Sequence, residues 1–123
     1  MNDIIEYGDI YLVGFAPSVG HEFQGDRPAV VVQSNEQLAK TNLVTVMPLT
    51  SKVDKAHNGD ILIKKDEVNM LFCDSLVKVH NIESFDRSRF IKKIGKISTQ
   101  DSEKIKIYLI RHFDLLSANP SKI

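Results

Sequence analysis

The stretch Pro28-Ala29-Val30-Val31-Val32-Gln33 decides the fold class of this 123-residue chain. Four apolar residues, three of them β-branched, follow the proline directly, a composition typical of a buried strand. Because proline has a fixed φ and no backbone N–H, the strand is expected to begin at this proline and to cover residues 29–33. Arg27, immediately before it, is then expected at a loop-to-strand junction, where rigid neighbours position a side chain that stays accessible.

Further strands are predicted on either side of this one from apolar runs and alternation. They cover residues 10–15, 42–47, 60–64 and 75–80. Gly14 is expected at a barrel corner, and Pro48 is expected to stop the 42–47 strand. The polar segments 51–59 and 65–74 are predicted loops.

Two helices are expected after these strands. Asp86 is a capping residue for a short helix over 86–91. Ser98 or Thr99 caps a longer one, whose apolar residues recur at helical spacing. These residues are Ile105, Leu109, His112 or Phe113, and Leu116. Several short strands followed by a terminal helix favour a mainly β fold closed as a small barrel, rather than a parallel sheet.

Length and composition indicate a single domain over 1–123, with a core at about 7–116 and a frayed tail at 118–123. No apolar run reaches 18 residues, and Met1-Asn2-Asp3 does not resemble the basic start of a signal peptide, so a cytoplasmic protein without membrane association is expected. Cys73 is the single cysteine, and neither His57 nor His112 has ligands at metal-binding spacing. No metal and no cofactor is therefore predicted.

The charge is balanced overall and uneven along the chain. Sixteen basic and sixteen acidic residues cancel, yet residues 1–26 hold five acidic side chains and no Lys or Arg. Residues 86–111 hold eight basic side chains against three acidic ones. This asymmetry is compatible with a polyanion docking on one side, and equally with a solvated basic helix face.

Two motifs carry a resemblance to a known family. The segment His21-Glu22-Phe23-Gln24-Gly25-Asp26-Arg27-Pro28 resembles the signature loop of the MazF/PemK/Kid toxin ribonucleases, and Pro48-Leu49-Thr50-Ser51 resembles their P-[IVL]-T-S element. The resemblance covers roughly residues 7–116. It implies an SH3-like barrel, an active-site arginine at Arg27 and a threonine hydroxyl at Thr50 that meets it at the scissile phosphate. His21, Glu22, Gln24 and Ser51 would line the RNA site.

A third motif follows the fifth predicted strand. By strand alternation Lys78 and His80 share one face, which is an acid–base arrangement or simply the exposed side of a strand. Residues 74–90 align without gaps to a family segment, and the alignment makes His80 the general base and Lys78 the acid, with Arg27 as the alternative acid. Glu83 replaces a usual arginine at an RNA-contacting position. A competing register matches Cys73-Asp74 and makes Asp74 the base.

The resemblance implies a metal-independent endoribonuclease toxin that cleaves single-stranded RNA and inhibits growth by degrading mRNA. The reaction is attack of a ribose 2′-OH on its own phosphodiester. The implied partners are a cognate antitoxin protein and a second copy of the chain in a homodimer. The alternative is a non-catalytic module of the same fold, either a gyrase-directed poison like CcdB or an inactive antitoxin-binding homologue.

Overall fold

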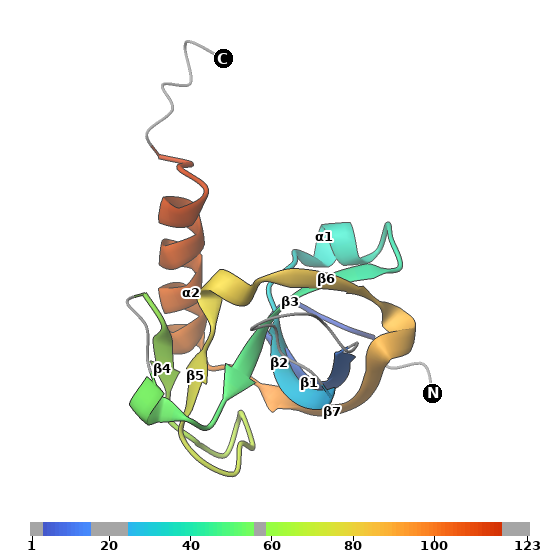
Figure 1. Cartoon of the computed structure of the whole chain (residues 1–123). Helices are drawn as coiled ribbons and strands as arrows, with labels where there is room; N and C mark the ends of the chain where they lie inside the picture. The colour runs from blue at the N-terminus through green and yellow to red at the C-terminus, as the bar shows by residue number, and fades with distance from the viewer. Residues whose placement is uncertain (1–3, 16–24, 56–58, 117–123) are drawn as a thin grey trace.

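The computed structural model describes residues 4–15, 25–55 and 59–116, which form seven strands and one long helix (Figure 1). The strands are β1 (Asp9–Phe15), β2 (Gly25–Val31), β3 (Leu43–Thr50), β4 (Ile61–Ile63), β5 (Ser75–Val77), β6 (Glu83–Asp86) and β7 (Phe90–Lys96). The helices are α1 (Asn35–Leu38) and α2 (Thr99–His112), with 3₁₀ turns η1 (Val53–Lys55), η2 (Val79–Asn81) and η3 (Arg87–Arg89). No helix in these ranges is long and apolar enough to cross a membrane.

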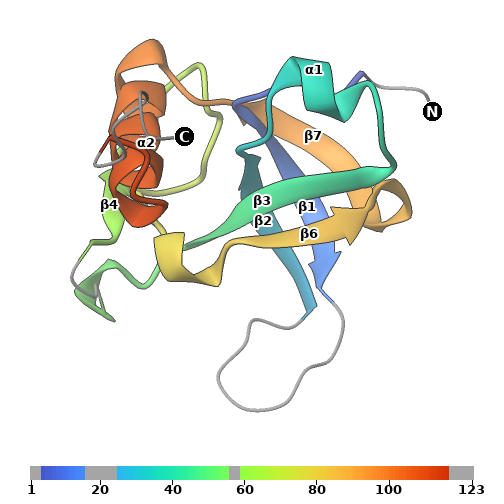
Figure 2. The same cartoon turned by 90° about the horizontal axis from the view of Figure 1, so that it is seen from above.

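Every strand pair is antiparallel, in the order β4-β5-β3-β2-β1-β7, and β6 also pairs with β3. The strands β6-β3-β2-β1-β7 curve around one interior, and η3 carries the chain from β6 to β7 (Figure 2). Within the described ranges no ladder joins β6 to β7, so the small barrel is open there. The mainly β fold with a C-terminal helix is confirmed.

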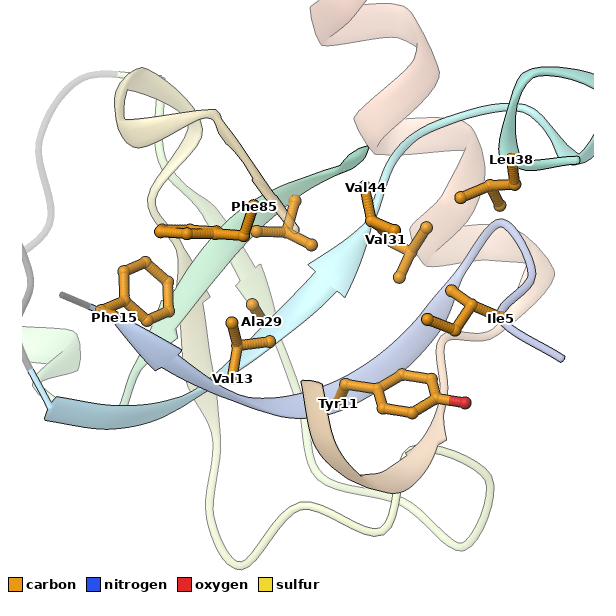
Figure 3. Close-up of a cluster of buried hydrophobic side chains, with 10 residues drawn as sticks. Ile5, Tyr11, Val13, Phe15, Ala29, Val31, Leu38, Val44 and Phe85 are labelled. Atoms are coloured by element: carbon orange, nitrogen blue, oxygen red, sulfur yellow. The ribbon is translucent and has the colours of Figure 1, made fainter. Parts of the chain in front are cut away.

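The central strands are buried on both faces. Ala29 and Val31 face the barrel interior (Figure 3). There the rings of Phe15 and Phe85 pack edge to face, with their centroids 4.7 Å apart. Val30 points the other way, into a second core that also contains Ile105 of α2. Burial on both sides explains why the sequence here is a continuous apolar run and does not alternate. Each fully buried aliphatic side chain contributes about 1.5–3 kcal/mol.

Both prolines lie inside strands, so the predictions that Pro28 starts one and Pro48 stops another are wrong. The β2–β3 ladder begins at Ala29, and Pro28 therefore has a paired neighbour only in β1. Residues 43–46 of β3 pair with β6, and residues 49–50 of β3 pair with β5. Pro48 lies between these two stretches. At such positions a missing N–H removes no ladder bond.

Three other sequence predictions need correction. The strand expected over 75–80 ends at Val77 because the Lys78 N–H donates to the Pro48 carbonyl and η2 follows. The short helix over 86–91 is only η3, although Asp86 caps it as expected, accepting from the Ser88 N–H at 2.9 Å. That bond, with the Ser88 side chain and the Arg89 charge, lowers the pKa of the Asp86 carboxyl. Strands β6 and β7 were not predicted at all, since most of their side chains are exposed.

Helix α2 begins as predicted and ends differently. Ser98 caps it by accepting from the Asp101 N–H at 3.1 Å, and Ile105 is fully buried against the outer core. The apolar face predicted further along is not buried, because Phe113 is 54% exposed and Leu116 is 82% exposed.

The loop from Lys65 to Asp74 lies against β7 at Gly95. The Lys96 N–H donates to the Val68 carbonyl at 3.1 Å, which brings the two backbones together. A Cβ at Gly95 would meet the Asn69 carbonyl group, with its carbon at 2.6 Å, and the Val68 oxygen at 2.8 Å. Only glycine allows this approach, since backbone atoms at such distances cannot be avoided by a rotamer change.

We expect Gly95→Ala to lower the free energy of unfolding by about 1–3 kcal/mol, the usual cost of overpacking, and to displace the loop from β7. Urea denaturation measures the first effect and protease susceptibility of the loop the second. Gly14→Ala is the matched control, because a Cβ there meets only ordinary contacts at 3.5 and 3.8 Å. Equal stability of the two variants would contradict the close-contact argument.

Candidate functional site

An open groove of about 940 Å³, here called the Arg27 groove, lies between the ends of β2 and β3, strand β7 and the loop 65–74. The strands contribute Leu12, Gly25, Asp26, Arg27, Pro28, Leu49, Thr50, Lys92, Lys93 and Ile94. The segments after β3 and before β5 contribute Ser51, Lys52, Met70, Leu71, Phe72 and Cys73, and β5 contributes its first residue, Ser75. The groove therefore joins parts of the chain that are far apart in sequence.

Strand register brings Arg27 and Thr50 together. The β2–β3 ladder ends with Ala29 opposite Pro48, and continuing that register by two residues sets Arg27 opposite Thr50. Both residues are half-buried at the groove. The Thr50 hydroxyl accepts from the Lys52 N–H at 3.2 Å, which fixes its oxygen, and Ser51 is exposed beside it. An arginine next to two hydroxyls is a suitable arrangement for an anion, because the guanidinium fork can hold two oxygens.

The charged side chains of the groove are mostly basic. Among the described residues of the lining, Lys52, Lys92 and Lys93 accompany Arg27, against one carboxylate at Asp26. Lys93 also pairs with the fully buried Asp9 at 3.3 Å, which anchors β7 to the start of β1. The three lysines were not predicted as site residues. The basic segment that includes Lys92 and Lys93 was the available signal, and it was interpreted as a docking side or a helix face.

Lys78 lies outside the groove lining, in a buried ion pair. Its ammonium contacts the Asp60 carboxylate at 2.5 Å, and the two side chains are 11% and 1% exposed. This pair joins η2 to the segment before β4. The prediction that Lys78 and His80 share one strand face is wrong, because the strand ends before Lys78.

His80 is exposed on η2 and packs beside α2. The Tyr108 hydroxyl lies 3.4 Å from Nδ1 of His80 and 3.1 Å from Nδ1 of His112, and the two imidazole rings are 6.2 Å apart. Removal from solvent, with a smaller effect from the Asp60 charge, raises the pKa of the Tyr108 hydroxyl. His80 is not among the residues that line the Arg27 groove.

The other predicted site residues are placed as follows. Glu83 is exposed at the start of β6, opposite Val46, and does not line the groove. Asp74 is exposed and is not among the residues that line the groove, although its neighbours Cys73 and Ser75 are. Its Oδ1 accepts a hydrogen bond from the Lys65 N–H at 3.0 Å. His21, Glu22 and Gln24 lie outside the described residues.

Residues 4–15, 25–55 and 59–116 contain no group of three or more His, Cys, Asp or Glu side chains that could hold a metal ion.

A small open β-barrel with a basic groove at the ends of β2 and β3 is the architecture of this protein. Its sequence over residues 6–113 matches the family described as the PemK-like, MazF-like toxin of type II toxin–antitoxin systems. The chain belongs to that family, and the resemblance seen in its motifs is confirmed.

Individual relatives agree with this assignment. Endoribonuclease MazF9 of Mycobacterium tuberculosis is 29% identical over 115 residues, 89% of this chain and 97% of the relative. The crystal structure of a MazF from Deinococcus radiodurans superposes with a TM-score of 0.77 at 22% identity, covering 92% of this chain and 99% of that one. A mycobacterial endoribonuclease in complex with its cognate antitoxin gives a TM-score of 0.65 at 18% identity, covering 92% and 96%.

We expect Lys78→Met to lower the free energy of unfolding by about 3–5 kcal/mol, because it leaves the buried Asp60 carboxylate without its ammonium partner. The double variant Lys78→Met with Asp60→Asn removes both charges and should recover part of that loss. Urea denaturation of the three proteins measures the effect. A single variant as stable as the unmodified protein would contradict a structural role for the pair.

Proposed function

We propose that this chain is an endoribonuclease that cleaves single-stranded RNA without a metal ion and, as a toxin, inhibits growth by degrading mRNA. The observation that carries the proposal is the Arg27 groove, in which the two family motifs, Arg27 and Thr50-Ser51, line one basic surface. The name of the relative MazF9, an endoribonuclease, supports the same reaction.

The proposed reaction is attack of the ribose 2′-oxygen on the adjacent phosphorus. The new P–O bond forms a 2′,3′-cyclic phosphate, and the bond to the 5′-oxygen breaks. One proton leaves the 2′-OH and one arrives on the departing 5′-oxygen, so the reaction needs a base and an acid. Charge also accumulates on the phosphate oxygens in the transition state and must be stabilised.

Arg27 is assigned to that charge. Its planar guanidinium would present two parallel N–H groups to two phosphate oxygens. Thr50 would orient the phosphate through its hydroxyl, with Ser51 beside it. Lys52 and Lys92 would attract the flanking phosphates of the strand.

For the general base, the geometry favours the Asp74 register. Asp74 itself is not among the residues that line the groove, but both of its sequence neighbours are, whereas neither His80 nor its neighbours Val79 and Asn81 are. The hydrogen bond from the Lys65 N–H fixes one carboxylate oxygen of Asp74. We therefore propose Asp74 as the base, with His80 as the alternative.

We also propose that the chain forms a homodimer and is neutralised by a cognate antitoxin. A mycobacterial endoribonuclease of the same fold has been crystallised with its antitoxin. Light scattering that gave a monomer mass at tens of micromolar protein would contradict the dimer.

Arg27→Ala should reduce the cleavage rate by about 10²–10³, the usual cost of removing one charge-stabilising donor. Arg27→Lys keeps the charge and loses the two-pronged contact, so an intermediate rate is expected. The measurement is single-turnover cleavage of a panel of RNAs in the presence of a chelator. Arg111→Ala, an exposed site on α2 outside the groove, is the control. Full activity of Arg27→Ala would refute the assignment, and loss of wild-type cleavage with the chelator would refute metal independence.

Asp74→Asn should lower the rate by about 10²–10⁴, because the amide cannot take the 2′-OH proton. His80→Ala should stay within a few-fold of the unmodified protein. The same RNA and single-turnover assay compare the two, with circular dichroism as the check on folding. The reverse result would return the base to His80. A wild-type protein that cuts no RNA would favour a non-catalytic binding module.

A further inference from the structure

The loop 65–74 exposes large apolar side chains at the groove. Phe72 is 99% exposed and Met70 is 61% exposed, and both line the Arg27 groove. Aromatic side chains normally bury most of their area, so a fully exposed phenylalanine beside a candidate active site indicates a binding surface. Val68, on the same loop, is 55% exposed and is not part of the groove lining.

The loop that carries Phe72 is held rigidly by its own polar side chains. Asp66 Oδ1 accepts from the N–H groups of Val68 and Asn69 at 2.8 and 2.7 Å. The fully buried Asn69 accepts from the Asp66 and Leu71 N–H groups, both at 3.0 Å, and donates to the Lys64 carbonyl at 2.9 Å. Neither Met70 nor Phe72 takes part in this side-chain network. Their exposure is therefore built into a fixed backbone and is not a consequence of a loose loop.

The backbone at Met70 has an unusual conformation. Its φ is +56°, in the left-handed region that costs a non-glycine residue about 1 kcal/mol or more. The Met70 N–H still donates to the Asp66 carbonyl at 3.1 Å, which closes the turn. Strain of this kind persists where surrounding structure fixes it, and functional sites are where it is most often found.

The charge around Phe72 identifies the partner. Arg27, Lys52, Lys92 and Lys93 line the same groove, and among the described residues of its lining Asp26 is the one carboxylate. A basic surface with an exposed aromatic ring is the combination that binds single-stranded nucleic acid, since phosphates meet the cations and bases stack on the ring. An apolar protein segment would offer no negative charge to Lys52 and Lys92.

We propose that Phe72, with Met70 on the same loop, is a stacking platform for one unpaired nucleobase of the RNA strand whose phosphate Arg27 holds. This inference rests on the proposed function and assigns a substrate-positioning residue to it. Every base has a π-face, so the platform positions the strand and tolerates different bases. It also requires an unstacked base, which favours single-stranded over double-stranded RNA.

The test uses the absence of tryptophan from this chain. Phe72→Trp introduces a single indole at the platform, and Ile107→Trp introduces one at an exposed site on α2 outside the groove. The probe is a single-stranded 2′-O-methyl RNA of about 12 nucleotides, within the usual length of such sites, which cannot be cleaved because its 2′-oxygens are blocked. An abasic strand of the same length carries the phosphates without the bases.

The intact RNA should quench the fluorescence of Phe72→Trp, and the abasic strand should not. Ile107→Trp should respond to neither. In parallel, Phe72→Ala should weaken RNA binding and lower kcat/KM for cleavage by about 10- to 100-fold, whereas Val68→Ala on the same loop should change neither.

The remaining outcomes separate this inference from the proposed function. If Phe72→Ala binds and cuts RNA as the unmodified protein does and Phe72→Trp is not quenched, the platform is refuted and the nuclease stands. Quenching in a protein that cuts no RNA would keep the platform and refute the nuclease. If the unmodified protein does not cut RNA and RNA does not quench Phe72→Trp, both the platform and the nuclease are refuted. A blue shift of Phe72→Trp emission that depends on protein concentration, without RNA, would show contact with a second copy and overturn the proposal.

Discussion

Strand β3 exchanges one neighbour for another midway along its length, and the rest of the molecule is arranged around that exchange. One edge pairs with β2, while the other pairs first with β6 and then with β5. The first partner closes the barrel interior, and the second adds the small outer sheet that packs with α2. The exchange point falls at Met47-Pro48, where a residue without an N–H is tolerated. Thr50, at the end of the strand, is thereby placed at the mouth of the groove.

The central strands could be predicted from the sequence because they are buried on both sides. Residues such as Val30 and Val31 point into different cores, and the resulting apolar run is visible without any knowledge of the partners. Strand β7 could not be recognised in the same way, because Lys92 and Lys93 are exposed and its pattern does not alternate. The end of β5 depends on contacts from Lys78 to Pro48 and Asp60, which are distant in sequence. No local signal marks such contacts.

Part of the candidate site could likewise be predicted from the sequence, and part could not. Arg27 and Thr50 lie in short motifs, and the ladder between their strands places them together once the register is known. The opposite wall of the groove includes residues 70–72, which no motif marks, and their loop is positioned by the contact between Asn69 and Gly95. The choice between the Asp74 and His80 registers needed three-dimensional information too. The alignment alone favoured His80, whereas the groove lining favours the segment that contains Asp74.

The internal hydrogen bonds of the loop 65–74 have a consequence for how this protein can evolve. Asp66 and Asn69 shape the backbone, and Gly95 receives it, so selection for stability acts on these three positions. Positions 70 and 72 present their side chains outward and can drift without loss of the fold. Substitutions at positions 70 and 72 can therefore change the surface of the groove, while the loop backbone and its contact with β7 stay the same.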